Sequence, residues 1–197
     1  MKPILLAAIV VTAYPTVNNQ ELILPIKGNS KVNAGYYQKR GKKIHGAIDQ
    51  NTPVGTPIRA VADGVVTNVY SQRRYMRETV RIMRKLKLKP SYSWPIAKKR
   101  LRKCRCLGKI RRLSRSPWIS GAYITIEHKT DNGKVFKSQY MHMSKIFSPF
   151  GRKVKQGEII GLSGDTAIIY NNPHLHFQIR RRGVKRNPKK YIRGFKN

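Results

Sequence analysis

The run Pro173-His174-Leu175-His176-Phe177 constrains the fold more than any other stretch of this chain. As a β-strand, the run places His174 and His176 on one face and its apolar side chains on the other. Two imidazoles on one face of a rigid strand can hold a metal ion or a water molecule. The alternative is a pair of surface histidines on a half-buried strand, and this run by itself does not decide between the two.

Short apolar runs separated by turn residues predict an all-β antiparallel domain. The expected strands lie at residues 22–26, 58–62, 65–70, 122–128, 135–143 and 174–179, with further strand and turn over 154–166. Two turn sequences stand between neighbouring strands, and we expect each to close a hairpin: Asp63-Gly64 and Asp131-Asn132-Gly133.

Residues 71–116 interrupt the strand pattern with a strongly basic segment. They hold 18 lysines and arginines and one acidic residue, Glu78, for a net charge of +17. Apolar residues at helical spacing predict a helix near 75–86 and a second near 96–107, with Pro90 and Pro95 between them. We expect this insertion to be a mostly helical appendage outside the sheet.

The whole chain is strongly cationic, with 42 Lys and Arg residues against 8 Asp and Glu residues and a formal net charge of +34 at pH 7. This balance indicates an anionic partner: nucleic acid, a membrane surface or an acidic cell-wall polymer. We expect such a partner to contact residues 71–116 and 180–197, where basic residues concentrate.

The N-terminus begins with a basic residue and a short apolar stretch over residues 1–13, too short to span a bilayer. This pattern is typical of a secretory signal peptide, and also fits an N-terminal anchor or a first strand. The length suits one domain. We divide the chain into an N-terminal segment 1–21, a domain over 22–180 interrupted by 71–116, and a basic tail over 181–197.

Cys104 and Cys106 are the two cysteines of the chain. Residues two apart rarely form a good disulfide, because their Cβ atoms diverge in a strand. No second cysteine pair is present to complete a zinc cage. We therefore expect free thiols, or at most a weak redox pair.

Four of the five histidines stand in motif-like contexts: His45, His142, His174 and His176. His45 and Asp49 are four residues apart and share a face in a strand, which Gly46 favours over a helix. With one histidine of the pair at 174 and 176, they would form a set of two imidazoles and one carboxylate. Such a set leaves one position open, as a catalytic zinc requires.

Taken together, these motifs resemble the lysostaphin-type zinc metallopeptidases, the peptidoglycan endopeptidases of bacteria and phages. The resemblance covers residues 22–70 and 118–180. Three blocks carry it: His45 to Asp49 with 53–58 and 62–66; Tyr140-Met141-His142-Met143-Ser144; and 154–166 followed by His174-Leu175-His176-Phe177.

The resemblance implies an antiparallel twisted β-sheet or sandwich and an active site with one Zn²⁺ per chain. By that resemblance His45, Asp49 and His176 are the metal ligands. His142 and His174 are then the catalytic histidines that do not bind the metal. Inactive relatives typically lose ligands, and this chain keeps all of them, so we expect activity.

Some further positions match or lie near positions of the family pattern, and others differ from it. His128 matches a position that is usually structural, and Tyr36 and Tyr37 lie near the upstream position of the family's transition-state tyrosine. Gln178 stands where the family often has Glu, and Asn172 where Gly is common. The insertion 71–116 replaces what is normally a short connection.

The sequence thus predicts a zinc metalloendopeptidase that hydrolyses peptide cross-links of bacterial peptidoglycan. Its role would be cell-wall lysis or remodelling, including wall penetration by a phage particle. We expect it to be secreted, periplasmic or in the cell envelope, or else in a phage virion. The alternative is a basic structural protein of a virion or envelope that binds nucleic acid or membrane on a relic peptidase fold.

Overall fold

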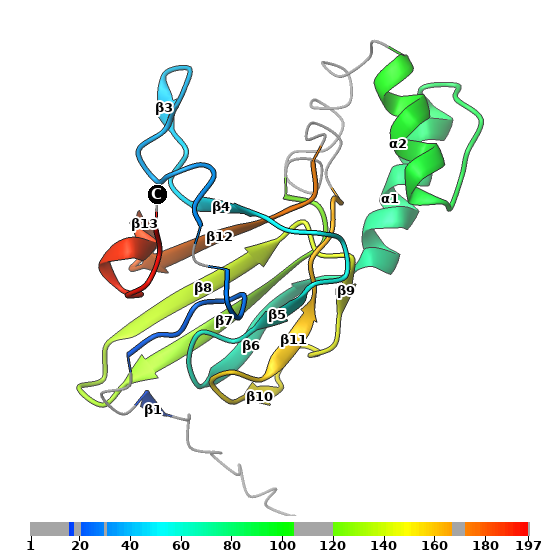
Figure 1. Cartoon of the computed structure of the whole chain (residues 1–197). Coiled ribbons are helices and arrows are strands. Elements are labelled where there is room, and N and C mark those ends of the chain that lie inside the picture. The colour runs from blue at the N-terminus through cyan, green and yellow to red at the C-terminus, as the bar shows by residue number, and fades with distance from the viewer. Residues whose placement is uncertain (1–15, 18–20, 30, 105–119, 167–171, 197) are drawn as a thin grey trace, which may run out of the picture.

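The computed structural model describes residues 16–17, 21–29, 31–104, 120–166 and 172–196 (Figure 1). The predicted signal peptide at residues 1–13 lies outside these ranges. The elements are β1 (Thr16–Val17), β2 (Lys39–Arg40), β3 (Lys43–Ile44), β4 (Ile48–Asn51), β5 (Pro57–Arg59), β6 (Gly64–Tyr70), α1 (Gln72–Lys85), α2 (Trp94–Lys103), β7 (Tyr123–Thr130), β8 (Val135–Met141), β9 (Lys145–Ile146), β10 (Lys153–Val154), β11 (Ile159–Leu162), β12 (His174–Arg181), β13 (Val184–Arg186) and the 3₁₀ helix η1 (Pro188–Lys190).

Within the described ranges, eight strands form one sheet in the order β10-β6-β7-β8-β12-β13, with β1 beside β7 and β4 beside β12. A second sheet has the order β5-β11-β9, and β2 and β3 form a separate hairpin (Figure 1). The pairings are antiparallel except that of β1 with β7. The predicted all-β antiparallel fold with a helical insertion is confirmed.

The hydrophobic core lies between the two sheets. It includes Ile58 of β5 and Ile160 of β11 from the small sheet, and Ile124 and Phe177 from the large one, each fully buried. Burial alternates along β7, because successive side chains of a strand point to opposite faces. The face of the large sheet that turns away from this core is therefore available for a functional site.

Two details of the strand prediction are wrong. Residues 22–26 form no strand, since Pro25 cannot donate to a ladder; Ile26 is nonetheless buried in the core. The turn Asp63-Gly64 closes no hairpin: β5 pairs with β11 and β6 with β7, so the chain crosses there between sheets. Asp63 instead accepts hydrogen bonds from Gln156 and Lys155. The second predicted hairpin, between β7 and β8, is confirmed.

The helices α1 and α2 form an appendage beyond the end of the sheet (Figure 1). The Ser71 hydroxyl caps α1 by accepting from the backbone N–H of Arg74. Pro95 lies inside the first turn of α2 rather than before it, where its missing N–H is harmless. The apolar faces of both helices pack together and against Tyr70. Neither helix in the described ranges is long and apolar enough to cross a membrane.

Two further expectations need correction. Cys104 is disulfide-bonded, so the free-thiol prediction is wrong for this residue; Cys106 lies outside the described ranges. Residues 181–196 are part of the domain rather than a separate tail. β13 pairs with β12, and Ile192 is buried in the main core.

Candidate active site

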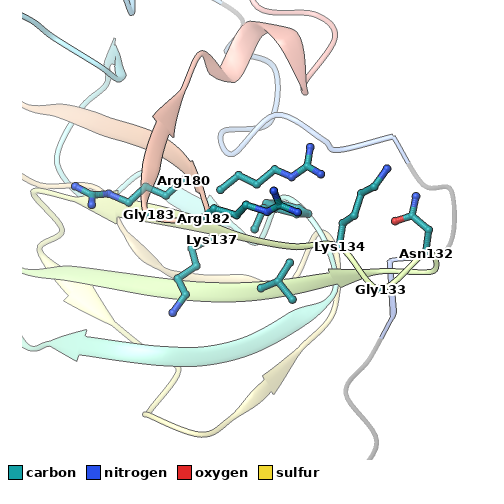
Figure 2. A pocket seen from close by; sticks show the side chains of 10 residues that line it. Asn132, Gly133, Lys134, Lys137, Arg180, Arg182 and Gly183 are labelled. Atoms are coloured by element: carbon teal, nitrogen blue, oxygen red, sulfur yellow. The ribbon is translucent and has the colours of Figure 1, made fainter.

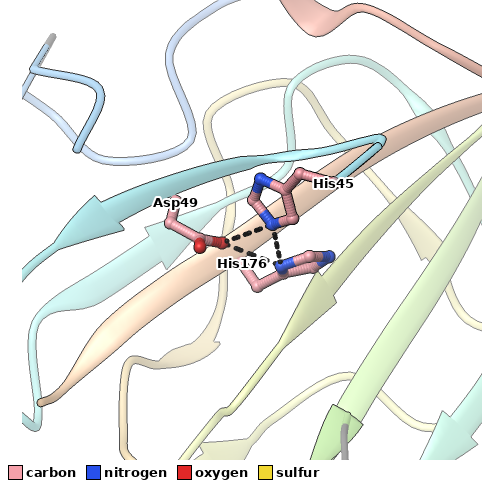
Figure 3. A group of neighbouring side chains, drawn as sticks. All are labelled: His45, Asp49 and His176. Carbon is pink, nitrogen blue, oxygen red and sulfur yellow. Dashed lines mark hydrogen bonds and ion pairs between the residues drawn. The ribbon is translucent and has the colours of Figure 1, made fainter. Parts of the chain in front are cut away.

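Three predicted site residues are brought together by the pairing of β4 with β12. In this antiparallel pair His176 lies directly opposite Asp49. Gly46 adopts a left-handed conformation with φ of 69°, which a residue without Cβ accepts readily, between β3 and β4. His45, which precedes this glycine, lies with its imidazole against the other two side chains (Figure 3).

The donor atoms of these three residues form a compact triangle. Asp49 Oδ1 lies 2.8 Å from His176 Nδ1 and 3.2 Å from His45 Nε2, and the two nitrogens are 3.0 Å apart. Ligand atoms around a tetrahedral zinc, with bonds of about 2.0–2.1 Å, are separated by about 3.3 Å. The triangle therefore has nearly the dimensions of a zinc site. Among the described residues, this is the one group of this kind.

A second layer of contacts orients the donors. The backbone carbonyl of Gly35 lies 3.2 Å from His45 Nδ1, and Nε2 of the same ring faces the other two donor atoms of the triangle. Arg40 of β2 donates to Asp49 Oδ2 at 2.9 Å, on the oxygen that does not face the histidines. Metal-binding side chains characteristically have such outer partners.

The site favours a charged Asp49 carboxylate and a neutral His176 imidazole. Burial alone would raise the pKa of Asp49, but hydrogen bonds from His176 and His45 hold that pKa well below its usual range. Burial lowers the pKa of His176, and the bond to Asp49 opposes this only in part. A carboxylate with unprotonated imidazoles is the state that binds a metal cation.

The other two predicted site residues lie beside the triangle. His174 is two residues before His176 on β12, and His142 follows the end of β8. The ring centroid of His142 lies 4.5 Å from that of His174 and 5.7 Å from that of His176. All five predicted residues therefore meet at one end of the large sheet.

His142 and His174 are held by backbone contacts. His142 has φ of 65°, a left-handed conformation that non-glycine residues rarely adopt outside special sites, and its N–H donates to the Ser120 carbonyl. His174 Nδ1 donates to the carbonyl of Asn172 at 2.9 Å, which leaves Nε2 as the nitrogen that can accept a proton. Burial, followed by the neighbouring His174 and His176, lowers the pKa of His142 well below its usual value.

Comparison with known proteins finds a family to which part of the chain is similar. Residues 106–188, which include three of the clustered histidines, match peptidase family M23. We call the domain that contains this match the M23 domain. The match does not extend to His45 and Asp49, which the fold brings to the same site.

The M23 domain is also similar to individual proteins. It is 38% identical over 71 residues to the peptidoglycan DD-endopeptidase ShyA of Vibrio cholerae, which is 36% of this chain and 15% of ShyA. It is 48% identical over 48 residues to lysostaphin of Staphylococcus simulans, which is 24% of this chain and 10% of lysostaphin. The chain thus spans a small part of these relatives.

A solved structure supports the fold over most of the chain. A zinc-containing peptidase from Vibrio cholerae superposes with a TM-score of 0.55 at 22% identity, covering 85% of this chain and 39% of that one. At this level of identity the likeness concerns the fold alone. It agrees with the predicted lysostaphin-type β architecture.

A groove of about 660 Å³ runs from the triangle along the large sheet of the M23 domain. Its floor consists of rows of directly opposed residues on β7, β8 and β12. The first row is Tyr123, Met141 and His176; the second is Thr125, Gln139 and Gln178; the third contains Lys137 and Arg180. Five of the lining residues are basic: Arg40, Lys43, Lys137, Arg180 and Lys185. No acidic residue of the described ranges lines it.

A second pocket, of about 570 Å³, lies between the β7–β8 and β12–β13 hairpins (Figure 2). It contains none of the clustered histidines, so it is distinct from the triangle. Its basic lining residues are Lys134, Lys137, Arg180, Arg181 and Arg182. Lys137 and Arg180 line both the groove and this pocket.

Sequence reasoning missed part of the site. Arg40 was not predicted, because only folding places it beside Asp49. The groove positions Gln178 and Arg180 follow His176 at intervals of two and could have been found by extending the strand period. Tyr36 donates its hydroxyl to the Lys185 carbonyl, and neither Tyr36 nor Tyr37 lines the groove.

His128 lies in the core, away from the groove. Its Nδ1 donates to the Asp63 carbonyl at 2.7 Å, and its Nε2 lies 2.7 Å from the Ser138 hydroxyl. Burial lowers the pKa of His128 to about 4, so the ring is neutral near pH 7. These contacts agree with the structural role that the family resemblance implies.

Proposed function

We propose that this chain is a zinc-dependent endopeptidase that hydrolyses peptide cross-links in bacterial peptidoglycan. The observation that carries the proposal is the triangle of His45, Asp49 and His176 with two further histidines beside it. The match to peptidase family M23 and relatives named as peptidoglycan endopeptidases support the same activity. A cell-wall substrate also favours a secreted or envelope location, or a phage virion.

The donor set fits zinc. Two imidazole nitrogens and one carboxylate oxygen are ligands that zinc accepts, and their separations of 2.8–3.2 Å suit a tetrahedral site with one open position. We assign His45, Asp49 and His176 as ligands of one zinc ion per chain. When bound, zinc would supply a Lewis acid that activates water and polarises a peptide carbonyl.

We assign His142 and His174 to proton transfer and to stabilisation of developing charge. His174 Nε2 can accept a proton from the attacking water, because its Nδ1 is already committed as a donor to Asn172. His142, buried within 4.5 Å of the His174 ring, can donate to the carbonyl oxygen as it becomes negative or to the departing amine. The groove that begins at His176 would hold the peptide.

The test combines metal content with wall hydrolysis. The purified chain should contain one zinc and release new amino groups from peptidoglycan, and a chelator should stop this until zinc is restored. Asp49→Ala and His176→Ala should each lose the zinc. Asp131→Asn, which removes a carboxylate from the β7–β8 turn, is the matched control and should keep it. Full zinc content in both ligand variants would overturn the assignment.

A second function, binding of an anionic polymer, is favoured by the surface of the appendage. On α1 the side chains of Arg73, Arg77, Arg81 and Arg84 are exposed at helical spacing, while the apolar face packs inward. Such a row can contact phosphates of nucleic acid or an acidic envelope polymer. If polymer binding were the main function, the chain would be a basic structural protein of a virion or envelope with a relic peptidase fold. Steeply salt-dependent DNA binding without wall hydrolysis would support it.

A further inference from the structure

A row of charged side chains, three of which line the groove, crosses the large sheet, and peptide hydrolysis at the triangle does not require it. Glu127, Lys137, Arg180 and Lys185 are successive cross-strand partners on β7, β8, β12 and β13. Directly opposed residues of neighbouring strands point to the same face of a sheet. These four side chains therefore share the face that carries His176, and the row has three bases and one acid.

Two of the bases in this row have no carboxylate partner. Lys137 forms an ion pair with Glu127, with 3.0 Å between Nζ and Oε2. Arg180 and Lys185 lie directly opposite each other, and neither forms an ion pair with an acidic residue of the described ranges. Like charges in this relation destabilise a sheet. The pKa of Lys185 is lowered by burial and, after that, by the charge on Arg180.

The position of Lys185 is fixed by packing against the triangle. A Cβ at residue 46 would lie 2.6 Å from Lys185 Cδ, so Gly46 provides the space for this side chain. The ammonium donates to the backbone carbonyl of His45 at 3.3 Å. The backbone of Lys185 is held as well, because its carbonyl accepts from the Tyr36 hydroxyl. The unpaired ammonium is therefore built into the wall of the groove beside a candidate metal ligand.

The spacing along β12 places the second cation on the substrate path. Arg180 follows His176 by four residues, which is about 13 Å in a strand. A peptide bound in an extended conformation covers this distance in about four residues. An anionic group between Arg180 and Lys185 would thus belong to a residue within about four positions of the cleaved bond.

We propose that Arg180 and Lys185 bind a carboxylate of the substrate, and so select cross-link peptides that carry a free carboxylate near the cleaved bond. This proposal rests on the proposed peptidase function. The guanidinium offers two parallel donors to a carboxylate, and the ammonium offers a third. A neutral oligoglycine bridge or an amidated peptide lacks the carboxylate that would offset the two positive charges of Arg180 and Lys185. The basic pocket in Figure 2, which shares Arg180, extends the same positive surface.

The experiment compares two synthetic cross-linked peptides that differ only in a free carboxylate or a carboxamide within four residues of the cleaved bond. The zinc-loaded chain should cleave the acid with a kcat/KM at least about tenfold higher, mainly through a lower KM. Arg180→Gln and Lys185→Gln should each bring this ratio toward one while zinc content stays at one per chain. Arg186→Gln removes the same charge from the opposite face of β13, where residue 186 pairs with Ile179, and should keep the ratio.

Two results would overturn the subsite. One is equal cleavage of the acid and the amide by the unmodified chain; the other is an unchanged ratio in both Arg180→Gln and Lys185→Gln. If neither peptide is cleaved, the proposed function has failed, and calorimetric binding of the same two peptides to the zinc-loaded chain decides the subsite. Tighter binding of the acid that is lost in Arg180→Gln supports it, and equal affinities overturn it.

Discussion

Arg40 and Asp49 form an ion pair of 2.9 Å through the Asp49 oxygen that faces away from the histidines. The other oxygen of Asp49 contacts both His45 and His176. One carboxylate therefore joins the β2–β3 hairpin to the candidate metal site. Because both oxygens are engaged, the carboxylate is already oriented for a metal ion.

Arg40→Gln should weaken zinc binding by about 10- to 100-fold, the usual effect of removing a partner that orients a ligand. Lys39→Gln, which removes a charge from the neighbouring position of β2, should leave the affinity unchanged. Competition with a chelating dye measures both. Equal zinc affinity in Arg40→Gln and the unmodified chain would show that the ion pair does not organise the site.

His142 and His174 should be required for turnover but not for metal binding. His174→Ala should lower kcat on a cross-linked peptide by roughly 100-fold or more, the usual scale for an acid–base group. At residue 142 we choose Asn, because it tolerates the left-handed backbone and so tests the imidazole alone. His142→Asn should show a similar loss with one zinc retained. Near-normal turnover in either variant would exclude that histidine from catalysis.

The basic appendage should be dispensable for folding of the M23 domain. Replacing residues 71–116 with a short Gly-Asn turn should leave a folded, zinc-binding peptidase, because loop-closure entropy depends weakly on length. The same deletion should weaken binding to DNA or another anionic polymer and reduce its salt dependence. Circular dichroism, zinc content and binding at several salt concentrations measure these effects.

Loss of folding on this deletion would show that the appendage belongs to the core. The deletion removes two contacts between the appendage and Asp165, whose carboxylate binds Lys98 at 2.8 Å and the Trp94 indole at 3.0 Å. Asp165→Asn in the chain that keeps residues 71–116 is the matched control, since it weakens this attachment and leaves the appendage in place. Unchanged polymer binding after a clean deletion would show that the charge is only a solvated surface.

His128 should make stability depend on pH between about 6.5 and 4. Its pKa in the folded chain is about 4, below the ordinary value of 6.5, because burial disfavours the charged ring. The unfolded chain therefore takes up a proton first as the pH falls, and stability declines from pH 6.5 until about pH 4. The full effect is about 3 kcal/mol.

The comparison with His128→Gln isolates this effect, since glutamine does not titrate. Urea unfolding at several pH values should show that the stability advantage of the unmodified chain shrinks as the pH falls through this window. The other buried histidines contribute equally to both chains and cancel in the difference. A difference that stays constant from pH 7 to 4 would contradict the assigned pKa.

Three features could be predicted from local sequence patterns: the strand that carries His174 and His176, the β7–β8 hairpin and the helical character of the insertion. Local signals suffice there, because alternation of apolar and polar residues, turn residues and helical spacing act over a few positions. The resemblance of three short blocks also indicated the peptidase family before any geometry was known.

The pairing partners of these local elements depend on packing across the whole domain. Asp63-Gly64 has the composition of a hairpin turn, but β5 pairs with β11 and β6 with β7, because burial between two sheets outweighs local turn preference. Likewise Arg40 meets Asp49, and Lys137 meets Arg180, only through the way the strands and hairpins are placed in the fold. Contacts between distant residues depend on how whole faces pack, and no short stretch of sequence encodes them.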